Sequence, residues 1–244
     1  MKRLLLTVGF DGTAYHGWQI QPNGITVEEV IKTAVSKLLK TETEIFGASR
    51  TDAGVHAKGF CFHLDCEENI PESAFLRGLN SLLPSDIAVV GVKEVPNDFN
   101  ARYDALGKTY IYRILNTNKK DPFLSRYTWQ IEKPLDIEKM NDFCKKIVGE
   151  HDFSAFSSSG RTVESTVRTV SECYTEKNGD IVSLHITANG FLYNMVRIIT
   201  GTAVEASFGK IDIEKIDDIF KLKKRDLAGI TAPPQGLILE KVHY

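Results

Sequence analysis

The sequence predicts a mixed α/β protein made of two similar halves, residues 1–104 and 105–244. Segments of strand character alternate with amphipathic helical segments, and the second half repeats the ingredients of the first. The chain has 244 residues, of which 42% are hydrophobic, which suffices for one large domain or two modest ones. We therefore expect two α/β halves facing a shared cleft, with their boundary near Ala105.

The first half has a β-α-loop-β-α-β pattern. Thr26 with Glu29 three residues later forms a capping box, and the apolar positions that follow make one helical stripe. Pro71 suits the first position of a second helix. The expected elements are strands at 3–10, 60–64 and 87–95 and helices at 27–38 and 71–82.

The second half contains a strong hairpin signal. Asn178-Gly179 lies between two strand-like runs and favours a tight turn with positive backbone angles. A serine-rich loop is expected at 151–162, and Pro233-Pro234 interrupts the chain before the last strand. The other expected elements are strands at 107–116 and 237–242 and helices at 136–148, at 191–207 and, short and acidic, to about residue 221.

Composition limits the class of protein. The four cysteines are scattered without a Cys-x-x-Cys pair, which indicates free thiols in a reducing compartment. No segment approaches the ~20 apolar residues of a membrane span, so we expect a soluble cytoplasmic protein. The net charge of −2 argues mildly against nucleic-acid binding. Basic residues nevertheless gather between 102 and 126, so a local basic cleft is compatible with the total.

The run Gly47 to Ala57 is the strongest candidate for chemistry. It presents Arg50 and Asp52 in a loop of small residues, where the backbone can come close to a ligand. A neighbouring cation favours the ionised carboxyl group, which suits a nucleophile or a base. The alternative is an ordinary capping aspartate that closes a surface turn.

The helix expected at 191–207 is apolar on nearly all sides yet contains Arg197. A buried arginine requires a carboxylate or a ligand anion, and Asp52 is a candidate partner; a salt bridge to a structural carboxylate or a helix C-terminus is the alternative. On the strand at 107–116, Lys108, Tyr110 and Tyr112 point the same way. Aromatic faces beside cations can hold unstacked bases, although an ordinary aromatic ladder explains the pattern equally well.

Other chemistries have weaker support. His56, Cys61, His63 and Cys66 lack the usual zinc spacing. An Asp52–His56 hydrolytic pair has no accompanying nucleophile motif, and neither a Walker loop nor a dinucleotide fingerprint is present. We therefore expect chemistry without metal, nucleotide or cofactor.

Several motifs follow one another along nearly the whole chain. They are Phe10-Asp11-Gly12-Thr13-x-Tyr15-x-Gly17-Trp18-Gln19-x-Gln21, Arg50-Thr51-Asp52-Ala53-Gly54-Val55-His56, Phe99-x-Ala101-Arg102, Tyr110-x-Tyr112, Asp152-Phe153-x-x-Phe156, Phe191-Leu192-x-x-Met195-Val196-Arg197 and Ala232-Pro233-x-x-Gly236-Leu237-x-Leu239. In this order they resemble the bacterial tRNA pseudouridine synthase A (TruA) family. One small departure is Ser49, where many relatives carry glycine.

The resemblance implies cofactor-free isomerisation of uridine to pseudouridine at positions 38–40 of the tRNA anticodon stem-loop. Asp52 matches the catalytic aspartate and Arg197 its basic partner. Tyr110 matches the tyrosine that stacks on the target base, Arg50 the residue that fills the space of the extruded nucleotide, and Leu237 an apolar wall. It also implies the pseudouridine synthase fold, with a mostly antiparallel sheet running through both halves and a central active-site cleft, and a homodimer. A catalytically inactive RNA-binding module is the alternative.

Overall fold

The computed structural model describes residues 1–67, 70–158 and 164–244. By its internal contacts the chain divides into two compact units, residues 1–106 with 238–244, and residues 107–237. The last strand is thus grouped with the first unit, whereas the expected second half, 105–244, included it. Residues 159–162 of the expected serine-rich loop lie outside the described part.

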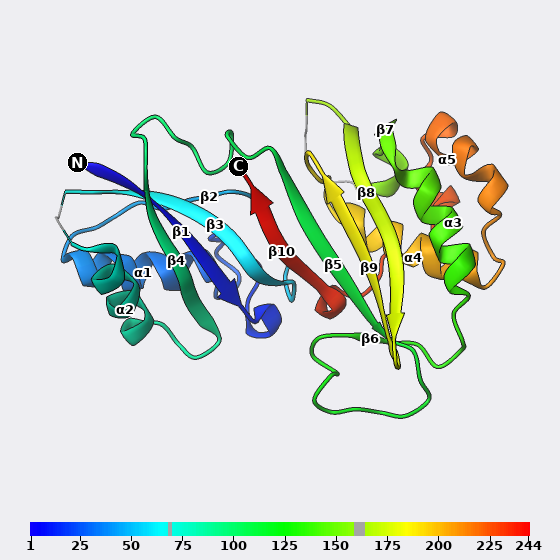
Figure 1. The fold of residues 1–244 in the computed structure, drawn as a ribbon, viewed down its shortest axis with the longest axis horizontal. Coiled ribbons are helices and arrows are strands. Elements are labelled where there is room, and N and C mark those ends of the chain that lie inside the picture. Colours follow the sequence, from blue (N-terminus) through cyan, green and yellow to red (C-terminus); the bar gives the residue numbers. More distant parts are fainter. Residues whose placement is uncertain (68–69, 159–163) are drawn as a thin grey trace. The chain divides into compact units, whose positions relative to one another are not determined.

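The first unit is a sheet in the order β4-β1-β3-β10, with β2 paired to β3 (Figure 1). Its pairs are antiparallel except for the parallel pair of β3 and β10. Most side chains of the two central strands, β1 and β3, are buried, so these strands contribute much of the hydrophobic core of this unit. The strands are β1 (Lys2–Phe10), β2 (Phe46–Gly47), β3 (His56–Cys66), β4 (Ile87–Val95) and β10 (Leu237–His243).

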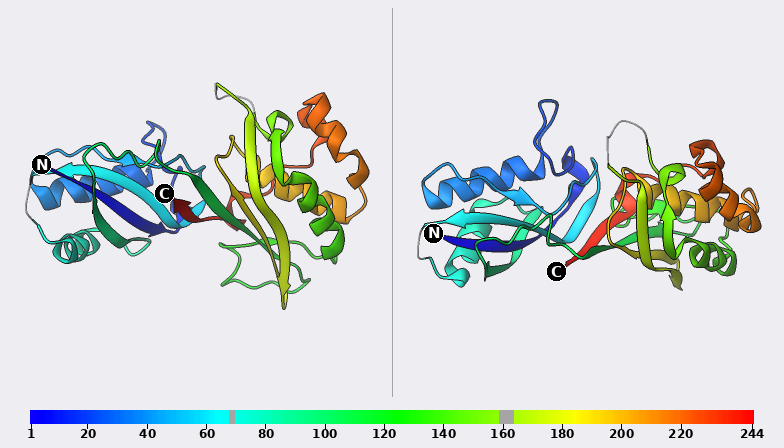
Figure 2. Two further views of the ribbon diagram at one scale, coloured as in Figure 1. Left: turned by 45° about the horizontal axis from the view of Figure 1, so that its top comes forward. Right: turned by 90° about the horizontal axis from the view of Figure 1, so that it is seen from above.

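The helices α1 (Val27–Leu39) and α2 (Glu72–Leu82) lie together against this sheet (Figure 2). As the capping box predicts, the Thr26 hydroxyl accepts a hydrogen bond from the backbone N–H of Glu29 at 3.4 Å. Pro71 is the residue before α2 and not its first helical position. Its backbone is extended, and its carbonyl accepts the first hydrogen bonds of the helix.

The loop after β4 is tied to β1 and β3 by specific hydrogen bonds. Arg3 pairs with Asp65 through two hydrogen bonds of 2.7 Å and also donates to the carbonyl of Phe99. The backbone N–H of Ala101 donates to Nδ1 of buried His63 at 3.1 Å, and the hydroxyl of Tyr244 donates to the carbonyl of Ala101. The Phe99-x-Ala101 motif thus fixes a loop on the sheet.

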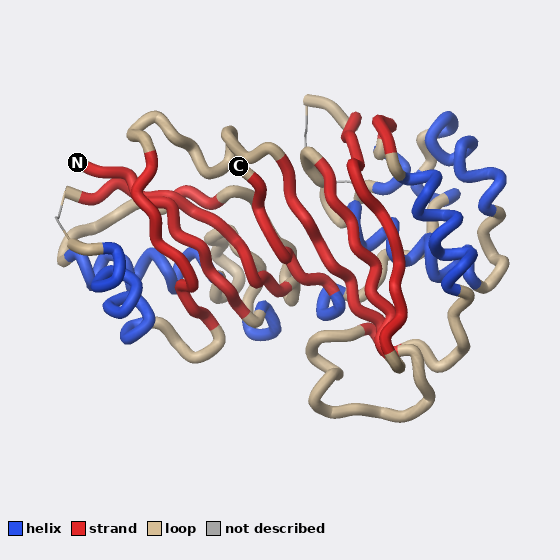
Figure 3. Tube along the Cα trace, in the orientation of Figure 1, coloured by secondary structure: helices blue, strands red, loops and turns tan. Residues whose placement is uncertain are grey.

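The second unit is a sheet in the order β5-β9-β8-β7, with the short β6 paired parallel to β5. The other pairs within it are antiparallel, and a hairpin joins β8 to β9. Its turn residues are Gly179, with φ of 58°, and Asp180, so the turn lies one residue later than the expected Asn178-Gly179. The helices α3, α4 and α5 lie beside these strands, as the blue and red segments of Figure 3 show. The elements are β5 (Gly107–Leu115), β6 (Trp129–Gln130), α3 (Ile137–Ile147), β7 (Gly149–Asp152), β8 (Val167–Asn178), β9 (Ile181–Ala188), α4 (Met195–Ser207) and α5 (Ile216–Leu222).

The helix α4 is shorter than its apolar pattern indicates. It begins at Met195, four residues after the expected start at Phe191. Asn194 adopts a left-handed backbone conformation, with φ of 61°, which stops the helix from continuing towards the N-terminus. With this correction, the predicted mixed α/β class with mostly antiparallel strands is confirmed within both units. In the described residues no helix is long and apolar enough to cross a membrane.

Candidate active site

The loop between β2 and β3 carries Asp52 in the first unit. The carbonyl of Asp52 accepts a hydrogen bond from the N–H of Val55 at 3.1 Å, so the aspartate opens a tight turn. Gly54, with φ of 76°, supplies the left-handed position of that turn. Asp52 is half-buried whereas Arg50 is exposed. The loop therefore holds the Asp52 carboxylate in a hydrogen-bonded turn, with the exposed guanidinium of Arg50 two residues before it.

The segment 15–18 forms backbone hydrogen bonds with this turn. The N–H of Trp18 donates to the carbonyl of Thr51, and the N–H of Gly54 donates to the carbonyl of Tyr15, both at 3.3 Å. Gly17 has φ of 82°, and a Cβ atom there would overlap the carbonyl oxygen of Thr51. The early Gly17-Trp18 motif thus sets the position of the backbone at Asp52.

The residues on either side of Arg50, Ser49 and Thr51, both have buried hydroxyl groups without a hydrogen-bond partner among the described residues. An unmatched buried hydroxyl costs free energy, on the order of 1–3 kcal/mol. Sequence reasoning did not single out these hydroxyls, because burial of one atom in a loop leaves no pattern in the sequence.

His56 has a structural environment. It is buried at the start of β3, and its Nδ1 accepts a hydrogen bond from the N–H of Gly12 at 3.1 Å. The same nitrogen lies 3.1 Å from a carboxylate oxygen of Asp11. Within the described ranges, no three or more His, Cys, Asp and Glu side chains are grouped so that they could hold a metal ion. These contacts give the Nδ1 side of His56 a structural environment.

The second unit holds Arg197 in the first turns of α4. Its Nε donates to the carbonyl of Ala232 at 2.7 Å, and its Nη1 donates to Oδ1 of Asn194 at 2.8 Å. The residue is half-buried, which corrects the expectation of full burial. Sequence reasoning did not identify these two acceptors: Asn194 lies inside the Phe191–Arg197 motif, but nothing in the sequence marks it as the residue immediately before the start of the helix.

Tyr110 and Tyr112 differ in role although both lie on the inner face of β5. Tyr110 is 7% exposed and meets Phe191 edge-on, with ring centroids 5.1 Å apart. Tyr112 is completely buried, donates its hydroxyl to the carbonyl of Pro233 at 2.7 Å, and has its pKa raised by burial. Tyr112 is therefore part of the core, while the ring of Tyr110 packs beside one of the motif aromatics.

Leu237 is the first residue of β10 and is buried. Its N–H donates to the carbonyl of Pro234, and the preceding Gly236 lies so close to the Tyr112 ring that a Cβ there would meet Cε1 at 2.6 Å. Gly236 therefore allows the segment 232–239 to pack directly against the Tyr112 ring. Of the five predicted site residues, Arg50 and Asp52 belong to the first unit and Tyr110 and Arg197 to the second. Leu237, although it begins β10, is the last residue of the second unit.

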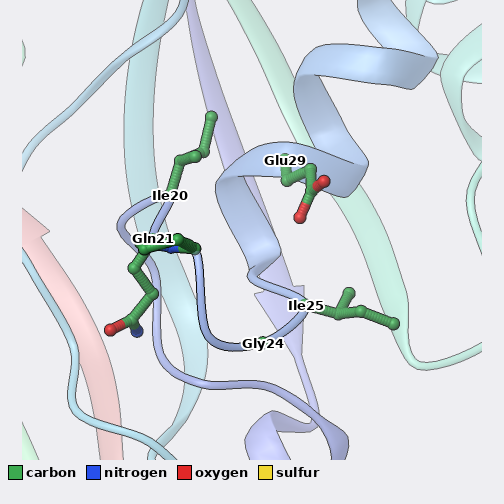
Figure 4. A pocket seen from close by; sticks show the side chains of 6 residues that line it. Ile20, Gln21, Gly24, Ile25 and Glu29 are labelled. Atoms are coloured by element: carbon green, nitrogen blue, oxygen red, sulfur yellow. The ribbon is translucent and has the colours of Figure 1, made fainter.

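A surface hollow in the first unit lies beside the turn that precedes α1 (Figure 4). None of the five predicted site residues lines it, and its only charged lining residue is Glu29. Such a surface does not suit a polyanion. Its lining residues are Ile20, Gln21, Pro22, Gly24, Ile25 and Glu29.

Comparison with known proteins decides the family. The pattern of the family described as tRNA pseudouridine synthase matches residues 6–104 and 143–244. The chain belongs to the tRNA pseudouridine synthase family. It is 48% identical over 244 residues to the tRNA pseudouridine synthase A of Thermoanaerobacter sp. (strain X514), with all of both chains covered.

Two further relatives of this pseudouridine synthase align over the full length of the chain and are also named as tRNA pseudouridine synthases. The tRNA pseudouridine synthase A 2 of Clostridium perfringens is 44% identical over all of both chains. The tRNA pseudouridine synthase A of Geobacter sp. (strain M21) is 44% identical over 100% of this chain and 99% of its own. Among solved structures, an archaeal box H/ACA sRNP Nop10–Cbf5 complex aligns over 82% of this chain and 44% of that chain, with 12% identity and a TM-score of 0.36, a level at which no residue correspondence follows.

Proposed function

We propose that this protein isomerises uridine to pseudouridine in tRNA, at positions 38–40 of the anticodon stem-loop. The observation that carries the proposal is the 48% identity over the whole of both chains to a protein named tRNA pseudouridine synthase A. The alternative of an inactive RNA-binding module has no support in the names of the relatives.

The reaction needs no external reactant. The bond between N1 of uracil and C1′ of ribose breaks, the base turns, and C5 bonds to C1′; C5 loses a proton and N1 gains one. In the proposed mechanism the Asp52 carboxylate acts while ionised, by attacking the sugar or the base or by removing a sugar proton. Its half-buried position in a rigid turn suits each of these routes.

The other proposed roles concern binding and electrostatics. Arg197 pairs with the Asp52 carboxylate and keeps it ionised. Tyr110 stacks on the uracil, Arg50 occupies the space of the extruded nucleotide, and Leu237 forms an apolar wall. The exposure of Arg50 and the burial of Leu237 support these assignments. Extrusion of the base costs a few kcal/mol of stacking, which such contacts offset.

The proposal includes a cytoplasmic homodimer that works without metal or cofactor. The four cysteines are free and buried, which is compatible with a reducing compartment. The two halves of the site are proposed to meet at a cleft between residues 1–104 and 105–244.

The test measures pseudouridine in an unmodified tRNA transcript after incubation with wild-type protein and with Asp52→Ala. Asp98→Asn, which removes an exposed carboxylate elsewhere in the first unit, is the matched control. We expect product at positions 38–40 with wild type and control and none with Asp52→Ala, while tRNA binding persists in all three. Binding without product by the wild type would favour the inactive module, and normal turnover by Asp52→Ala would remove the aspartate from the mechanism.

A further inference from the structure

The segment 117–128 forms a long excursion between β5 and β6, visible as the tan loop beneath the second unit in Figure 3. Both of its ends are anchored. The carboxamide of Asn116 donates to the carbonyls of Ile131 and Lys133, both at 2.9 Å, and accepts from the N–H of Leu135. Gln130 Nε2 donates to the carbonyls of residues 117 and 119 at 3.3 Å. The excursion therefore leaves the sheet from a fixed base.

The tip of the loop is also shaped by its own hydrogen bonds. Oδ1 of Asp121 accepts from the N–H groups of Phe123 and Leu124, at 2.8 and 3.3 Å. The N–H of Tyr127 and the hydroxyl of Thr128 both donate to the carbonyl of Leu124. These contacts set the tip before any partner arrives, which lowers the entropy cost of binding.

Phe123 projects from this tip with 88% of its surface exposed. No other large hydrophobic side chain in the described part of the chain is as exposed. A rigid loop that holds a phenylalanine in water has a ring face available for stacking, and aromatic rings on such loops are the usual platforms for unpaired bases.

Charge around the tip distinguishes between possible partners. Lys119 and Lys120 are exposed, and with Arg126 they give the segment three cations against the single anion Asp121. The whole chain carries a formal charge of −2, so this positive segment is local. Phosphates complement it, whereas two such loops facing each other in a dimer would bring like charges together.

We propose that the loop 117–128 binds an unpaired nucleotide of the RNA substrate, with the base stacked on Phe123 and the adjoining phosphates contacted by Lys119 and Lys120. This inference rests on the proposed function, because it takes RNA as the substrate. The contact is a binding contact, separate from the residues proposed for chemistry, so its loss weakens association and leaves the chemical step unchanged.

The experiment compares wild type, Phe123→Ala and Phe123→Trp for binding of an unmodified tRNA transcript at fixed salt. Loss of one base–aromatic stack weakens binding by about fivefold or more. We expect that increase in Kd for the Ala variant, near wild-type Kd for the Trp variant, and an unchanged turnover rate at saturating tRNA for both. Leu222→Ala, which truncates a 57% exposed side chain on α5, is the matched control and should bind normally.

A second variant tests the charge component without touching the ring. Lys119→Ala combined with Lys120→Ala should weaken binding and reduce the slope of log Kd against log salt by about 1.4, since each phosphate contact contributes about 0.7 with single strands. Normal tRNA affinity in Phe123→Ala would overturn the inference. A lower molar mass of Phe123→Ala by light scattering would also overturn it, because the loop would then contact a second copy. An inactive wild type would instead refute the proposed function.

Discussion

Arg197 and Ala232 are joined by two reciprocal hydrogen bonds. The side-chain Nε of Arg197 donates to the carbonyl of Ala232 at 2.7 Å, and the N–H of Ala232 donates to the backbone carbonyl of Arg197 at 3.1 Å. With the bond to Asn194 Oδ1, the guanidinium is held from two sides by its own unit. Preorganisation of this kind fixes a cation before substrate binds.

The segment that supplies the Ala232 carbonyl is itself fixed. Arg225 donates to the carbonyl of Gly229 at 2.8 Å and to the hydroxyl of Thr231 at 3.0 Å. On the helix side, a Cβ at Gly201 would overlap the carbonyl oxygen of Ile230, so α4 and this segment approach closely. Residues 225–232 therefore act as a strap across α4 that determines where the Arg197 side chain lies.

Asn194→Gly tests whether this fixation matters for catalysis. Glycine tolerates the φ of 61° at this position, so the backbone is preserved while the acceptor for Arg197 is lost. A hydrogen bond to a charged group contributes about 1.5–3 kcal/mol, and we expect kcat to fall by about tenfold with little change in KM. Asn194→Asp retains an oxygen acceptor and should lose less. Equal kcat in wild type and the Gly variant would show that the Ala232 carbonyl suffices.

The sequence predicts the helices, strands and turns whose signals are local. It does not predict features that depend on contacts between residues far apart in the chain. The strand 87–95 and the cap at Thr26 are set by their own residues and match the prediction, and the signal at Asn178-Gly179 locates the hairpin turn to within one residue. The apolar pattern predicts that the helix begins at Phe191, yet the left-handed backbone of Asn194 delays its start to Met195. The partners of Arg197 depend on the strap and left no periodic signal.

Thr51→Val tests the unmatched hydroxyl beside Asp52. No described group forms a hydrogen bond with the Thr51 hydroxyl oxygen. Valine replaces this unsatisfied buried hydroxyl with a methyl group of similar shape. We expect the free energy of unfolding to stay constant or rise by about 1 kcal/mol, measured by thermal unfolding. Thr51→Ser keeps the hydroxyl, loses a buried methyl group, and should be less stable than wild type. A loss of several degrees in the Val variant alone would show that the hydroxyl has a partner in solution.

His63 predicts a pH dependence of stability. Burial, aided by Arg3, lowers the pKa of His63 below its usual value, and its Nδ1 accepts the Ala101 N–H only while unprotonated. The histidine in the unfolded chain titrates near 6.5, so its contribution is complete above that pH and is lost as the pH falls towards the lower folded-state pKa. His63→Asn keeps an acceptor but cannot titrate, and should flatten the decline of Tm between pH 7 and 5. Parallel Tm profiles for the two proteins would contradict this linkage.

Gly17→Ala and Gly179→Ala separate backbone strain from steric overlap. Both glycines have positive φ, 82° and 58°, but a Cβ at Gly17 would overlap the Thr51 carbonyl, whereas nothing lies within 4 Å of one at Gly179. Gly179→Ala should therefore cost only the left-handed strain, about 1–2 kcal/mol, with normal activity. Gly17→Ala must in addition displace the backbone that carries Asp52, the proposed catalytic group. We therefore expect a larger loss of stability and a fall in kcat of about tenfold or more, since small displacements of a catalytic group are costly. Equal effects on Tm and kcat at the two sites would mean that the loop carrying Asp52 yields freely, and that its support by the Gly17-Trp18 segment has no bearing on the reaction.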